Sequence, residues 1–119
     1  MDTLEKARKC AGYLLERKAL NPVLFEVGKL TSLTDYFLIA SGGSSRQVQA
    51  LSRHLQRKMR EAGFRPYGIE GEQEGQWILL DFGDIVVHLF YEPVRTFYDL
   101  EGLWVEAPRV PIENAPPPD

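Results

Sequence analysis

The chain has 119 residues, 44% of them hydrophobic and 26% charged, with a formal net charge of −3 and a pI of about 5.4. This length suits one domain with a real core, and the acidic balance argues against a protein that holds nucleic acid by phosphate contacts alone. The sequence has no run of the roughly 18 apolar residues that a membrane-spanning helix needs, and its single cysteine, Cys10, excludes an internal disulfide and suits a reducing compartment.

The first elements predicted along the chain are a helix and two strands. Residues 2–19 carry apolar side chains at helical spacing, and Asp2 is placed to cap the first turn. No apolar signal region or Arg- and Ser-rich transit peptide precedes them, so we expect a cytoplasmic protein without membrane contact. Residues 23–28 form a strand, and residues 35–41 are a near-continuous apolar run, which is typical of a central strand covered on both faces.

A turn rich in Gly and Ser leads from this strand into a second helix that ends near Ala62. Ser44 or Ser45 caps the helix, and with the short strand expected at residues 65–70 the segment makes a βαβ unit. The surface of this helix away from its apolar stripe is basic, with Arg46, Arg53, Arg57, Lys58 and Arg60. That side could touch RNA phosphates, although a solvated charged face explains such a pattern more often.

Residues 76–82 and 84–90 predict a β-hairpin around a Phe82-Gly83 turn. In that register Asp81 lies opposite Asp84. Because side chains alternate between the faces of a strand, one face of the hairpin is purely apolar and belongs to the core. The other face is mixed and carries Trp77, Leu79, Asp81, Asp84, Val86 and His88.

The mixed face is the leading candidate for a binding surface. Two carboxylates directly opposite each other repel by a few tenths to about 1 kcal/mol, a cost that folding gives no reason to tolerate and that a basic partner would offset. The alternative is that helices cover this face and the acids only rim the turn.

Glu92-Pro93 starts the last helix. Residues 106–119, with five of the eight prolines, predict a disordered tail after one domain at 1–105.

Catalytic chemistry finds little support in the sequence. The Gly42-Gly43-Ser44 turn could cradle a phosphate and resembles the opening of nucleotidyltransferase sites, but the next strand offers only Glu70 where such an enzyme needs paired carboxylates. Two separate histidines and one distant cysteine lack the spacing of a zinc site. We therefore expect no catalytic residues, no metal and no cofactor.

Several segments, taken together and in this order, resemble the ribosomal silencing factor family (RsfS, Iojap-type) over about residues 3–105. They are Thr34–Gly42, Ser44–Val48, Glu70-Gly71, Gln76–His88 and Phe97–Trp104. Gly43, Gln47 and Arg95 differ from the residues expected in the family.

The predicted elements make a single α/β domain with a mixed five-stranded sheet and three main helices, and the resemblance implies a nucleotidyltransferase-like fold without the catalytic carboxylates. It also implies a protein that is not an enzyme. Family members bind the large ribosomal subunit through ribosomal protein L14 at the intersubunit face and repress translation by blocking subunit joining. The resemblance further implies a possible homodimer, and contact with ribosomal RNA is expected to be peripheral at most.

The expected partner-binding residues begin with Trp77 and Leu79, flanked by Asp81 and Asp84. A central aromatic anchor with a charged rim is common at protein–protein hot spots, and acids speed encounter with a basic partner. Tyr98, Asp99 and Trp104 are the next candidates, although Trp104 suits equally well a clamp that packs the last helix on the sheet. Two other functions remain open: nucleotide binding at residues 42–46, and a homodimeric adaptor that pairs through the Trp77 face.

Overall fold

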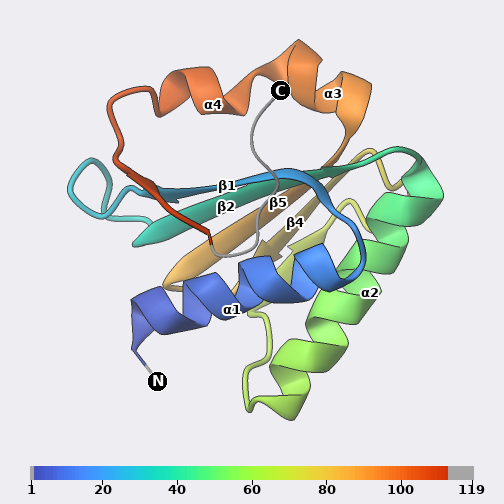
Figure 1. Cartoon of the computed structure of the whole chain (residues 1–119), viewed down its shortest axis with the longest axis horizontal. Helices are drawn as coiled ribbons and strands as arrows, with labels where there is room; N and C mark the ends of the chain where they lie inside the picture. The colour runs from blue at the N-terminus through green and yellow to red at the C-terminus, as the bar shows by residue number, and fades with distance from the viewer. Residues whose placement is uncertain (1, 113–119) are drawn as a thin grey trace.

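One mixed β-sheet lies between two helical layers in the computed structural model, which describes residues 2–112 (Figure 1). On one face pack α1 (Thr3–Glu16) and α2 (Ser45–Glu61), and on the other lie α3 (Glu92–Tyr98) and the short α4 (Leu100–Leu103). The strands are β1 (Leu20–Glu26), β2 (Tyr36–Gly42), β3 (Gly68–Glu70), β4 (Trp77–Asp81), β5 (Ile85–Tyr91) and β6 (Arg109–Val110). None of the helices in residues 2–112 is long and apolar enough to cross a membrane.

The sheet has six strands in the order β3-β4-β5-β2-β1-β6, not the five that the sequence predicted. The additional strand, β6, pairs antiparallel with β1 and lies inside the segment predicted to be a disordered tail. Ala107 is buried there, and the amide of Glu26 donates to the carbonyl of Pro108 at 2.9 Å. Residues 113–119 of the predicted tail lie outside the described part of the chain.

The helix starts follow the expected capping chemistry. The Asp2 carboxylate accepts from the amide of Glu5 at 2.8 Å, and the Ser44 hydroxyl accepts from the amide of Gln47 at 3.1 Å. The apolar stripes of α1 and α2 then bury against the same face of the sheet. Cys10 lies in this core, where burial raises the pKa of its thiol to about 12, as expected for a small buried hydrophobe.

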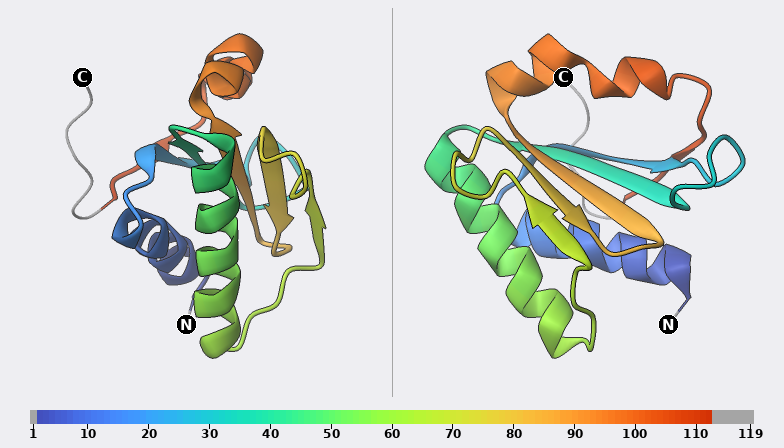
Figure 2. Two further views of the ribbon diagram at one scale, coloured as in Figure 1. Left: turned by 90° about the vertical axis from the view of Figure 1, so that its right-hand side faces the viewer. Right: turned by 180° about the vertical axis from the view of Figure 1, so that it is seen from behind.

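The predicted strand–helix–strand unit is present, but its two strands are not neighbours. β2 pairs in parallel with β5, and β4 stands between β5 and β3, so the β4–β5 hairpin occupies the space between the two strands that α2 connects. Figure 2 shows α2 running along the outside of this sheet, with α1 beside it. The hairpin therefore lies in the interior of the sheet, with β5 at its centre.

The predicted register of the hairpin is wrong by two residues. Asp81 pairs with Val86 and Trp77 with Phe90, so Asp81 and Asp84 are not opposite each other. The turn consists of Gly83 and Asp84, because Gly83 takes a φ of 87° at the first loop position, which glycine adopts without strain. A shift of two residues preserves the alternation of side chains, so the predicted apolar face is confirmed. The predicted mixed face keeps all its members except Asp84, and the expected repulsion between the acids is absent.

Asp84 points from this turn towards α1, on the opposite side of the sheet from the mixed face. Its carboxylate accepts from Lys6 Nζ at 2.8 Å and from the Thr3 hydroxyl at 3.2 Å. Lys6 is only 8% exposed and its ammonium lies 4.4 Å from the centre of the Phe64 ring. The pair therefore fastens the start of α1 to the hairpin, which gives Asp84 a role in the fold.

Replacing Asp84 should destabilise the domain. We expect Asp84→Asn to lower the free energy of unfolding by about 1.5–3 kcal/mol, because a buried ammonium loses its charged acceptor. The double variant Lys6→Met/Asp84→Asn should recover part of that loss, since no unpaired charge then remains buried. Urea denaturation of both variants checks this. Losses that simply add in the double variant would contradict the ion-pair interpretation.

Candidate partner-binding surface

A row of aromatic rings crosses the sheet beneath α3 and α4. Tyr98 lies 5.1 Å from Trp77 between ring centres, and Trp77 stacks on Phe90 at 4.9 Å. The row continues through His88, 5.9 Å from Trp77, to Phe37 and then to Trp104. Three of the residues expected at the site, Trp77, Tyr98 and Trp104, are thus parts of one packed array.

A hydrogen bond fixes the orientation of Trp77 in this array. The indole Nε1–H donates to Nδ1 of His88 at 3.0 Å, so His88 must keep Nδ1 unprotonated and carry its proton on Nε2. His88 is 5% exposed, and burial lowers the pKa of its imidazole to about 4. A neutral imidazole is therefore the form that holds the indole in place.

The face of β4 beside α3 remains open. α3 packs on β5 and β2, while β3 and β4 extend to one side of it (Figure 2). Trp77, Leu79 and Asp81 are consequently half-buried, and Asp81 also accepts from the amide of Gly83 at 2.8 Å. Phe97 and Tyr98 form the rim at 81% and 55% exposure. We call these five residues the β4–α3 surface.

Three expected residues lie apart from the β4–α3 surface, and the first is Asp84, whose carboxylate is bonded to Lys6 of α1. Trp104 packs edge-on against Phe37 with its centre 4.9 Å away, on the far side of His88, as expected for the aromatic clamp. Asp99 adopts a left-handed conformation, φ 46° and ψ 51°, and ends α3 before α4 begins. The single last helix predicted from the sequence is therefore broken at this residue.

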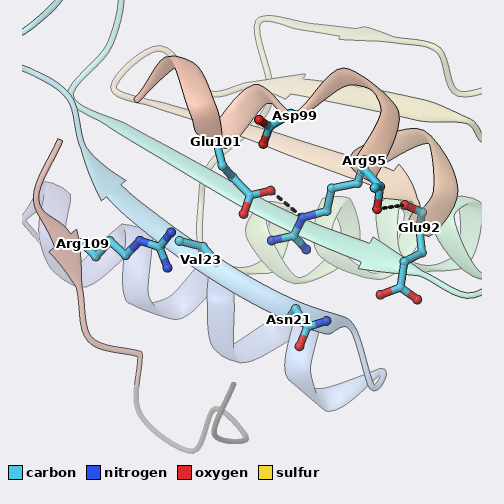
Figure 3. A pocket seen from close by; sticks show the side chains of 8 residues that line it. Asn21, Val23, Glu92, Arg95, Asp99, Glu101 and Arg109 are labelled. Carbon is cyan, nitrogen blue, oxygen red and sulfur yellow. Dashed lines mark hydrogen bonds and ion pairs between the residues drawn. The ribbon is translucent and has the colours of Figure 1, made fainter. Parts of the chain in front are cut away.

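A charged pocket of about 630 Å³ lies between α3, α4 and the start of β1 (Figure 3). Arg95 is buried at its wall and donates to Glu101 at 2.8 Å, to the Ser41 hydroxyl at 2.8 Å and to the carbonyl of Leu20 at 3.4 Å. These bonds tie α3 to α4 and to two strands. Arg95 therefore holds α3 in place on the sheet, a role that the sequence did not reveal.

The glycine-rich turn before α2 is filled by the protein's own side chains. Gln47 Oε1 accepts from the amide of Gly43 at 2.6 Å, and Gln76 Nε2 donates to the Ser45 hydroxyl at 2.8 Å. A Cβ at Gly42 would come within 3.0 Å of Val48. Close packing against α2 thus accounts for the glycine, and the Gly43 amide and the Ser45 hydroxyl, two groups that could contact a phosphate, already have internal partners. Within residues 2–112, no three His, Cys, Asp or Glu side chains cluster as a metal site would need.

Sequence reasoning missed three features of this region. It placed His88 on the mixed face but not as the acceptor for Trp77, and it did not identify Phe97 as an exposed residue of the rim. Arg95 was noticed only because it departs from the family pattern. The one available signal was the adjacency of Phe97 and Tyr98 on a short helix, since two neighbouring aromatic residues cannot share one buried face.

Acid should destabilise the fold through His88. In the unfolded chain His88 binds a proton near pH 6.5, whereas in the folded protein its pKa is about 4. Protonation therefore favours the unfolded state, so the contribution of neutral His88 to the free energy of unfolding is complete above pH 6.5 and is lost as the pH falls towards 4. We expect a loss of about 2 kcal/mol from this residue between about pH 7 and pH 5. Urea denaturation of wild type and His88→Gln, which lacks the titration, isolates the effect. The same pH dependence in both proteins would assign the effect to other groups.

Comparison with known proteins identifies relatives over nearly the whole chain. The family model described as "Ribosomal silencing factor during starvation" matches residues 1–119. The ribosomal silencing factor RsfS of Halalkalibacterium halodurans is 38% identical over 99 residues, which span 83% of this chain and 85% of the relative.

Structural comparison agrees with the sequence match. A crystal structure of a protein from Chromobacterium violaceum superposes with a TM-score of 0.86 and 36% identity, and the match covers 97% of this chain and 95% of that one. The mouse protein named "Mitochondrial assembly of ribosomal large subunit protein 1" is 35% identical over 94 residues, 76% of this chain but 41% of its own length. These matches in sequence and in fold show that the chain belongs to the ribosomal silencing factor (RsfS) family.

Proposed function

We propose that this protein binds the large ribosomal subunit through ribosomal protein L14 and represses translation by preventing the small subunit from joining. Membership of the ribosomal silencing factor family supports a role at the ribosome. The name of the mouse relative refers to the large subunit, and the cytoplasm is the compartment in which bacterial ribosomes would be met.

The observation that carries this proposal is the open β4–α3 surface. Phe90 and His88 hold Trp77 in one orientation, and the side chain of the neighbouring Tyr98 is 55% exposed. Rigid aromatic side chains that are already ordered lose little entropy when a partner covers them, which is typical of interface hot spots. Asp81 adds negative charge at the edge, which favours a basic partner such as a ribosomal protein.

The mechanism that we propose is steric and requires no chemistry. The folded chain measures 33 × 32 × 27 Å. A body of this size seated on the intersubunit face would occupy space that the other subunit needs. Sedimentation of purified subunits through a gradient, with and without the protein, tests this: we expect the protein to move with the large subunit and joined ribosomes to decrease. Normal joining with the protein left at the top of the gradient would refute the proposal.

Self-association is also favoured, because Phe97 of the β4–α3 surface and Leu103 of α4 are large apolar side chains exposed to solvent. A homodimer formed through them would compete with the ribosomal partner for Tyr98. Sedimentation at increasing protein concentration detects such a dimer. Dissociation of that dimer on addition of L14 would show that the two interactions share the surface.

Tyr98 offers a cleaner test of the docking surface than Trp77, whose removal would open a cavity and deprive His88 of its donor. We expect Tyr98→Ala to weaken binding to isolated L14 by about 2 kcal/mol or more, with only a small change in thermal stability. Leu33→Ala is the control, because Leu33 is 81% exposed in the loop between β1 and β2. Calorimetric titration measures both. Equal affinities for the two variants would remove Tyr98 from the surface.

The charge of Asp81 should act on the rate of association. Asp81→Asn keeps the oxygen that accepts from Gly83 but removes the charge, so we expect slower association with L14 at low salt, a smaller salt dependence and unchanged thermal stability. Glu61→Gln is the matched control, because it removes the same charge from an exposed residue of α2, on the opposite side of the sheet. Stopped-flow fluorescence gives both rates. Equal slowing in the two variants would mean that the rate of association depends only on the net charge of the protein and not on the position of Asp81.

A further inference from the structure

Four arginines form a single line along the outer side of α2. Arg46, Arg53, Arg57 and Arg60 are separated by seven, four and three residues. With 3.6 residues per turn and a rise of 1.5 Å per residue, these intervals place all four on one side of the helix, over a length of about 21 Å. We call these four residues the arginine stripe. It lies opposite the buried side of α2, which carries Val48, Leu51, Leu55 and Met59.

All four side chains of the arginine stripe are exposed, and no ion pair involves any of them within residues 2–112. Arg57 donates to Nδ1 of His54 at 3.0 Å, and His54 in turn contacts Glu16 through Nε2. Glu72, the acid beside α2, accepts from the neutral groups of Ser52 and Gln56 at 3.2 and 2.6 Å. The positive charge of the stripe is thus exposed to solvent and is not neutralised by a neighbouring carboxylate.

The arginine stripe belongs to a wider separation of charge. Residues 1–66 carry twelve Lys and Arg against six Asp and Glu, whereas residues 67–119 carry two against eleven. The net charge of −3 conceals this division. Because α2 packs on one face of the sheet and α3 on the other, the arginine stripe and the β4–α3 surface lie on different sides of the domain (Figure 2).

We propose that the arginine stripe binds the phosphate backbone of structured RNA, which, given the proposed function, is ribosomal RNA beside the docked protein. Guanidinium groups suit this task because their planar, permanently charged forks match phosphate oxygens. Contacts of this kind position a protein on RNA without reading its sequence.

The test compares two triple variants of the full chain that remove the same charge. Arg46→Gln/Arg53→Gln/Arg60→Gln removes most of the stripe and spares Arg57, which bonds to His54. Arg8→Gln/Lys9→Gln/Lys29→Gln removes three exposed charges elsewhere. Each protein is titrated against a fluorescein-labelled RNA duplex of about 16 base pairs, against isolated large subunits and against isolated L14, over a series of salt concentrations.

For the stripe variant we expect affinity for the RNA duplex and for the large subunit to fall by about tenfold or more. The slope of log affinity against log salt should decrease by about one for each arginine removed, hence by about three. Binding to isolated L14 should remain unchanged. The control variant should lose much less in every titration.

Three results would overturn the assignment. Unchanged affinity of the stripe variant for RNA and subunits removes the stripe as a site, and equal losses in both variants reduce the effect to net charge. Weaker binding of the stripe variant to isolated L14 would place these arginines in the protein interface instead. Failure of the wild type to bind isolated L14 refutes the proposed function, and the RNA duplex titrations then still decide whether the stripe binds RNA.

Discussion

The glycine-led turn between β4 and β5 fixes the register on which both sides of the domain depend. With Gly83 at a positive φ, Trp77 comes to lie beside His88 and Phe90, where it is stacked and hydrogen-bonded. The same turn sends Asp84 in the other direction, to Lys6 at the start of α1. A turn one residue earlier would place the two acids opposite each other and leave Lys6 without its partner. One backbone conformation thus orders the aromatic row and attaches the first helix.

The parts of the fold that could be predicted are those that depend on local pattern. Alternation of apolar and polar residues identified both faces of the hairpin, because that alternation survives any shift by an even number of residues. Capping residues identified the starts of α1 and α2 because an Asp or Ser side chain must satisfy nearby amides whatever the tertiary structure is. The family resemblance added the biological setting, which no residue pattern supplied.

The parts that could not be predicted depend on long-range contacts. The two residues of β6 are too few to show periodicity, and they form a strand only because β1 offers an edge for pairing. Arginine is usually a surface residue. Arg95 can be buried because β1 supplies a carbonyl and β2 a hydroxyl that accept its hydrogen bonds. The open face of β4 likewise results from where α3 docks. Sequence reasoning identified Trp77 as important but could not tell that α3 would cover only part of its face.

The short strands at both margins of the sheet have a consequence for how the protein behaves in a crowded cell. A strand at a margin offers a row of backbone donors and acceptors to which any other extended chain can add, and proteins often counter this with brief or proline-bounded strands. β3 has three residues and β6 has two, and Pro108 and Pro111 flank β6. The longer strand β1 would otherwise present Leu24 and Phe25 at that margin. Pro108 and Pro111, which flank β6, thereby limit the addition of further strands at this margin of the sheet.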